Sequence, residues 1–179
     1  KDGEVCLPSD QLYKKNILVA RGSYRPPTYV NVDLMKAGTT CFAKDAKAKE
    51  EDIVRLAEIT ITNLSSQGGI EHEDFLARVD LLTSINQMVV ITNFAQYFKL
   101  STYLQRFRPQ NIAVVLGAYN FMQIFDNEYN QASGQTLEAL GLLFRPNVKI
   151  YLYPYREESA TDEMIKLSTV KVSAENEHL

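Results

Sequence analysis

The sequence has 179 residues, enough for one domain with its own core, and its 45% hydrophobic and 23% charged residues are ordinary for a globular protein. Its net charge of −3 gives no electrostatic basis for binding nucleic acid or an anionic membrane. Apolar runs such as Ile112–Leu116 are far shorter than the ~20 residues of a membrane-spanning helix, and no secretory signal is visible, so a cytoplasmic location is expected.

The N-terminal third contains one clear strand. Residues 1–12 form a polar peripheral segment, and Asn16–Ala20 predicts a short buried strand. Arg21–Pro27 must then be extended or turning, because two of its residues precede a proline. Val30–Ala37 predicts a short helix, and the charged stretch Ala43–Asp52 predicts a solvated helix or loop.

From Ile53 onward the pattern alternates between strands and helices. Leu56–Thr62 alternates and is rich in β-branched residues, which predicts a strand, and Glu73–Ile85 has the 3,4 apolar spacing of an amphipathic helix. The remaining expected elements are strands at Met88–Ile91, Ile112–Leu116 and Val148–Tyr153, and helices at Ala95–Phe107, Phe121–Tyr129 and Thr136–Phe144, followed by a peripheral tail over 157–179.

Apolar strands without alternation are buried on both faces, and strands separated by helices need crossover connections. We therefore predict a single α/β domain over 1–179, with a parallel sheet of about five strands and helices on both faces in a Rossmann-like three-layer arrangement. Part of a (β/α)8 barrel is the alternative. The ragged ends suggest the C-terminal portion of a longer protein.

Parallel α/β folds bind ligands at the carboxyl ends of their strands. Polar residues follow each expected strand and could form such a site: Arg21, Ser23, Arg25, Asn63, Asn93, Asn120 and Arg156. Amides would orient a ligand there, and arginines would hold a carboxylate or phosphate. The alternative is that each Asn only caps the following helix or supports a tight turn.

His72 is the one candidate catalytic residue, as a general base in a loop after a strand end. The adjacent acids suit a helix start, so His72 could equally be a helix cap. The chain has no Gly-x-Gly-x-x-Gly, Walker or Gly-x-Ser-x-Gly motif, and Cys6 and Cys41 have no metal-ligand spacing. No metal is predicted, and no cofactor is identified.

Four stretches together resemble one family. They are Tyr13–Val19 with Arg21–Pro26, His72–Asp80, Ile91–Phe94 with Leu100 and Tyr103-Leu104, and Lys149–Arg156. They are similar to longer bacterial proteins that are labelled either nicotinate-nucleotide adenylyltransferase or TonB-dependent receptor. The resemblance covers roughly residues 12–179 and implies the C-terminal part of such a protein. It brings no catalytic set with it, because the His-x-x-His motif that the first label implies is missing here.

Two functions follow from these observations. The first is binding or transforming a small anionic metabolite or nucleotide at the strand carboxyl edge. The second is a non-catalytic structural or homo-oligomerisation domain of a larger bacterial protein. Whether the chain is an enzyme is left open by the sequence.

Overall fold

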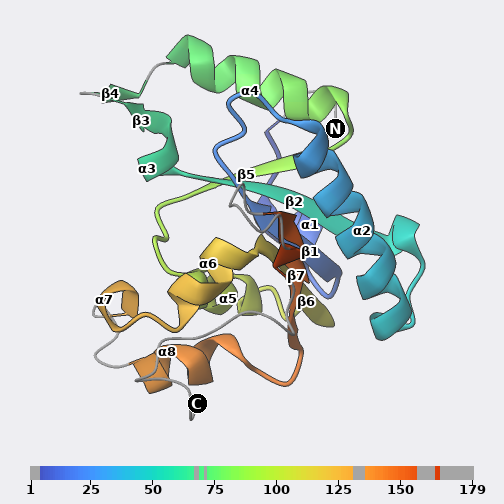
Figure 1. Ribbon diagram of the computed structural model, residues 1–179. Coiled ribbons are helices and arrows are strands. Elements are labelled where there is room, and N and C mark those ends of the chain that lie inside the picture. Colours follow the sequence, from blue (N-terminus) through green and yellow to red (C-terminus); the bar gives the residue numbers. More distant parts are fainter. Residues whose placement is uncertain (1–4, 67–68, 71, 131–135, 157–163, 166–179) are drawn as a thin grey trace.

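A computed structural model describes residues 5–66, 69–70, 72–130, 136–156 and 164–165 of the chain (Figure 1). Its centre is one parallel five-stranded sheet, with the strands in the order β5-β2-β1-β6-β7. The strands are β1 (Asn16–Arg21), β2 (Ile53–Thr60), β5 (Met88–Thr92), β6 (Asn111–Gly117) and β7 (Val148–Tyr153). The predicted parallel α/β architecture is therefore confirmed.

Helices cover both faces of this sheet (Figure 1). On one face lie α2 (Tyr29–Ala46) and α4 (His72–Ser84), and on the other lie α5 (Tyr97–Gln105), α6 (Ala118–Ile124) and α8 (Thr136–Leu143). Successive residues of β1 supply the two cores: Leu18 packs with Phe42 of α2, whereas Val19 packs with Leu104 of α5. This explains why the apolar strands show no alternation.

The strand order defines a switch point beside β1. The chain runs from β1 outward through β2 to β5, then returns through α5 to β6 on the other side of β1. The order differs from the sequential arrangement of strands around a (β/α)8 barrel. In an open doubly wound sheet, ligands bind outside the carboxyl ends of the strands at such a reversal. A ligand site is therefore expected at the carboxyl edge of this sheet.

Smaller elements connect these layers. They are α1 (Pro8–Leu12), the 3-10 helix η1 (Glu50–Asp52), α3 (Ile61–Leu64), α7 (Asn127–Asn130), and the short antiparallel pairs β3 (Ser65–Ser66) with β4 (Gly69–Ile70) and β8 (Tyr155–Arg156) with β9 (Met164–Ile165). The segment 1–12, expected to be polar and peripheral with a turn at residues 8–10, contains the short helix α1, with a proline at its start. The helix expected at Phe121–Tyr129 is divided between α6 and α7.

Two predicted boundaries near the site were wrong. The first helix does not end at Ala37 but runs to Ala46, because Phe42 and Ala43 are buried against the sheet and only the outward face of this charged stretch meets solvent. The second strand ends at Thr60 rather than at Thr62, and the chain then enters α3. Alternating β-branched residues favoured a strand there, but parallel pairing with β5 ends at Thr60 opposite Thr92.

Candidate functional site

A buried ion pair lies at the carboxyl ends of β1 and β2. Arg21 and Glu58 are direct neighbours across the two strands, and Arg21 donates through Nε to Glu58 Oε2 at 2.8 Å and through Nη2 to Oε1 at 3.0 Å. The Glu58 side chain is completely buried, and that of Arg21 is 11% exposed. A bidentate pairing of this kind fixes the orientation of the guanidinium plane and neutralises the charge of Arg21.

Neighbouring groups complete the environment of this pair. Thr92 of β5 donates its hydroxyl to Glu58 Oε1 at 2.6 Å, and Arg21 Nη1 donates to the carbonyl of Ala95 at 2.6 Å. The guanidinium carbon lies 4.4 Å from the centre of the Tyr97 ring, a cation–π arrangement. Burial acts to lower the pKa of Arg21, but the hydrogen bond and negative charge of Glu58 outweigh it, so the pKa stays above its ordinary value.

Two tyrosines on the α5 side extend this cluster. Tyr129 donates its hydroxyl to the same Ala95 carbonyl at 2.8 Å. The Tyr97 hydroxyl is buried and has no hydrogen-bond partner among the described residues. Burial raises the pKa of both phenols, so both are neutral at physiological pH. The ion pair is thus closed off from solvent on this side by aromatic rings.

A second group of charges links α4 to the loop after β1, and we call it the Asp74 cluster: Ser23, Arg25, Asp74 and Arg78. Asp74 accepts a hydrogen bond from Arg78 and lies 3.3 Å from the Nε of Arg25. Arg78 is 2% exposed, and it also donates to the carbonyl of Ser23 at 3.0 Å. The guanidiniums of Arg25 and Arg78 therefore share the carboxylate of Asp74.

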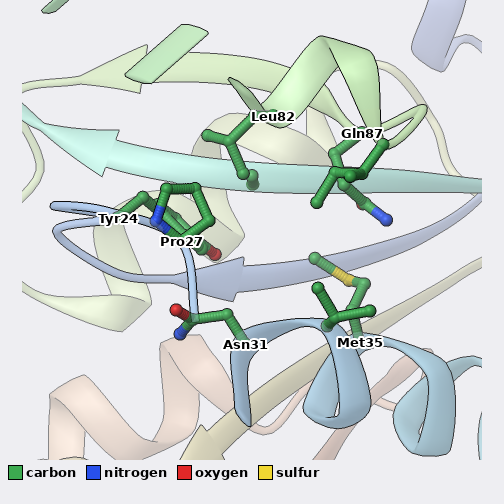
Figure 2. Close-up of a pocket in the computed structure, with 9 residues that line it drawn as sticks. Tyr24, Pro27, Asn31, Met35, Leu82 and Gln87 are labelled. Atoms are coloured by element: carbon green, nitrogen blue, oxygen red, sulfur yellow. The ribbon is translucent and has the colours of Figure 1, made fainter. Parts of the chain in front are cut away.

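An apolar cleft adjoins the Asp74 cluster, between α2 and α4 (Figure 2). Tyr24 and Pro27 of the β1–α2 loop form one end, Met35 of α2 and Leu82 of α4 face each other across it, and Gln87 closes the other end. Its enclosed volume is about 10 Å³, enough for roughly one water molecule. A larger ligand would have to displace these side chains.

Tyr24 holds the loop at the mouth of this cleft. Its φ angle of 48° lies in the left-handed region, and its buried hydroxyl donates to the carbonyl of Ala20 at 2.8 Å. The ring packs on Gly22, where an added Cβ would stand 3.1 Å from ring carbons. Glycine at position 22 therefore lets the loop fold back on the end of β1.

The structure brings together only some of the predicted site residues. Ser23 and Arg25 belong to the Asp74 cluster, and Arg21 belongs to the ion pair with Glu58. Asn93 is exposed after β5, and Asn120 is half-buried in α6. His72 is the exposed first residue of α4. The side chains of Asn63, which is in α3 instead of at a strand end, and of Arg156, in β8, lie outside the described part of the structure.

Sequence reasoning missed the residues that neutralise the predicted arginines. Glu58 lies inside a strand pattern, where an acid normally marks a solvent-facing position, and only the register of β1 with β2 shows its pairing with Arg21. Asp74 and Arg78 are four residues apart on a predicted helix, a spacing that does indicate an ion pair and could have been recognised.

The described residues contain no group of three or more His, Cys, Asp or Glu side chains that could hold a metal ion. None of the helices in the described ranges is long and apolar enough to cross a membrane. No family model matches the sequence, and none of the curated proteins compared matches it. The resemblance to the bacterial family therefore stays a prediction.

Proposed function

We propose that this chain binds a small anionic metabolite or nucleotide at the carboxyl edge of its sheet, with the anionic group at the Asp74 cluster. The observation that carries the proposal is the sharing of Asp74 by Arg25 and Arg78. Arg21, by contrast, pairs with the buried Glu58 and is itself only 11% exposed. An arriving phosphate or carboxylate can reach the guanidinium of Arg25, whose side chain is 46% exposed.

Arg25 is the residue best placed to meet a ligand. Its side chain is 46% exposed, while that of Arg78 is 3% exposed and holds α4 to the β1–α2 loop. Arg25 can swing from Asp74 to an external anion without breaking the core, and Arg78 keeps Asp74 satisfied when it does. The pair therefore divides into a binding arginine and a positioning arginine.

The apolar cleft offers a place for the uncharged part of the ligand. It begins at Tyr24 and Pro27, on either side of Arg25 in the chain (Figure 2). Ligand sites commonly combine apolar walls with a few polar groups that fix orientation. Separation of Met35 and Leu82 would open this cleft to a planar group such as a nucleobase.

Chemistry at this site would fall to His72. It begins α4, two residues before Asp74, and its side chain is exposed. As a general base it could act on a ligand whose anionic group is held by Arg25. A His72→Ala variant is then expected to retain ligand binding and to lose any turnover.

A thermal-shift screen with nucleotides and phosphorylated metabolites tests the binding proposal. A ligand at a hundredfold excess over its Kd stabilises the native state by about 2.7 kcal/mol, which should raise Tm by roughly 5–10 °C for a chain of this size. The Arg25→Gln variant should bind at least about tenfold more weakly, because a charge-assisted hydrogen bond is lost.

The matched control is Arg106→Gln, which removes an exposed arginine at the end of α5, away from the Asp74 cluster. It should respond to ligand as the unmodified protein does. The proposal fails if none of the compounds raises Tm, or if Arg25→Gln and Arg106→Gln show the same ligand response.

The second candidate function, homo-oligomerisation, is favoured by the edge strand β5. Its sequence, Met-Val-Val-Ile-Thr, is uncharged, and Ile91 is 45% exposed. The opposite edge strand, β7, carries Lys149, which pairs with Asp45, and is followed by Pro154. Charged residues and prolines protect sheet edges, so β5 is the less protected edge. Two copies related by a two-fold axis could pair their β5 strands without opposing like charges.

Sedimentation equilibrium distinguishes this second function. A dimer that Ile91→Lys converts to monomers would support pairing through β5. Leu137→Lys, at an exposed apolar position of α8, is the control and should leave the dimer intact. A monomeric unmodified protein at high concentration would exclude this role for the chain alone.

A further inference from the structure

A polar groove lies at the opposite end of the sheet, where β1 begins. It has a volume of about 360 Å³ and is lined by Lys14, Lys15, Asn16, Lys47, Asp52 and Gln110, together with Ala46, the last residue of α2, and Ala48. This is within the usual range of ~300–1,000 Å³ for small-molecule sites. The lining is polar and contains no aromatic ring, which suits a ligand that is itself polar throughout.

The charge of the groove is positive. Three lysines and one aspartate line it, so its formal net charge is +2 (3 − 1). Within the described residues, none of the three ammonium groups forms an ion pair. The Lys14 ammonium lies 5.2 Å from the centre of the Tyr13 ring instead. Three lysines that line one groove with a single aspartate are suited to a multiply charged anion.

Two of these lysines occupy backbone positions that disfavour them. Lys14 has a φ of 55° and Lys47 a φ of 51°, both in the left-handed region that glycine and asparagine tolerate best. Lys47 follows α2, at the kind of helix end where glycine is the usual residue. Lysine at both positions costs stability that a glycine would restore, and both side chains line the same groove.

We propose that this groove is a second binding site, for a small polyphosphate group held by Lys14, Lys15 and Lys47. The site lies across the sheet from the Asp74 cluster and is independent of the function proposed there. Lysines serve as point-charge partners for phosphate, and a diphosphate chain matches both the charge and the polar lining. The proposal also explains why lysines occupy two strained backbone positions, because their side chains bind the ligand although their backbone conformation lowers stability.

An alternative role for Lys47 makes the opposite prediction about stability. A cation at a helix C-terminus interacts favourably with the helix dipole. If this were its role, Lys47→Gly would lower Tm. Under our proposal, removal of the left-handed strain should raise Tm by about 2–4 °C while pyrophosphate binding is weakened.

The experiment is calorimetric titration of the full chain with inorganic pyrophosphate at low and high salt. We expect binding that weakens as salt rises, because exposed charges are screened. The Lys14→Asn/Lys47→Asn double variant keeps residues that tolerate the left-handed region and should lose at least about tenfold in affinity. Lys15→Gln should also weaken binding, and Lys36→Gln, on the exposed face of α2, is the control.

Backbone NMR shifts locate the bound pyrophosphate. They should change at residues 14–16 and 46–48, and the changes at these residues should be lost in the Lys14→Asn/Lys47→Asn double variant. The proposal is overturned if pyrophosphate does not bind at millimolar concentration, if the double variant binds it as well as the unmodified protein, or if Lys47→Gly lowers Tm.

Discussion

Removing Arg21 should destabilise the protein because it leaves a buried carboxylate without its cation. In Arg21→Met, Glu58 loses both guanidinium hydrogen bonds and, among the described residues, keeps the one from Thr92, in a position with no solvent exposure. The Ala95 carbonyl also loses a donor. Breaking one side of a buried ion pair typically costs about 3–5 kcal/mol, which corresponds to a Tm lower by roughly 6–20 °C in a chain of this length.

The double variant Arg21→Met/Glu58→Leu separates the cost of an unpaired charge from the value of the pair. Replacing both partners with apolar side chains of similar volume is often neutral or stabilising by ~1–4 kcal/mol, so the double variant should be more stable than Arg21→Met. Urea unfolding of the unmodified protein, both single variants and the double variant gives the coupling energy. A cost below about 1 kcal/mol for Arg21→Met would refute the reasoning, because that is the range of solvent-exposed pairs.

Three further predictions concern packing and pH. Gly38→Ala should lower the free energy of unfolding in urea by about 1–3 kcal/mol, because its Cβ would stand 2.5 Å from a methyl group of Val115. Gly141→Ala, which has open space around it, should raise the free energy of unfolding by up to ~1 kcal/mol, and equal effects of the two variants would contradict this packing. Burial raises the pKa of Tyr24, so the neutral phenol stabilises the fold below about pH 10 and this stabilisation is lost as the pH rises further. Above about pH 10 the Tm of Tyr24→Phe should therefore fall less steeply than that of the unmodified protein, and parallel Tm curves for the two proteins would contradict this prediction. Hydrogen bonds from a tyrosine and a lysine of β7 lower the pKa of Asp45, so its contribution to stability is present above about pH 4 and is lost as the pH falls further. In Asp45→Asn, Tm should therefore depend less on pH below about pH 4, and the same pH dependence as in the unmodified protein would count against the contact.

The residue pattern of a single strand predicts where that strand ends, but it does not predict the partners of the side chains there. The sequence correctly placed Arg21, Ser23 and Arg25 at the end of the first strand, because a buried run followed by polar residues and prolines marks that point. It treated the arginines as available to a ligand. Their partners, Glu58 and Asp74, come from other elements, 37 and 49 residues further along the chain, so only the packed structure shows that one arginine is satisfied and the other shares its carboxylate.

The sequence by itself determined the fold class, because an apolar run such as Ile112–Leu116, flanked by helical patterns, predicts a buried strand of a parallel sheet. The run Met88–Ile91 was also predicted to be a strand, but the structure shows it as a partly exposed edge strand. Strand order was decided by the tertiary structure, since many orders bury the same residues and only side-chain fit between layers selects one. The tertiary structure also decided the length of α2. The charged residues after Ala37 suggested a solvated segment, but the packing of Phe42 against the sheet continues the helix to Ala46. Which charges stay available for binding depends on contacts across strands, and those contacts exist only after the sheet has formed.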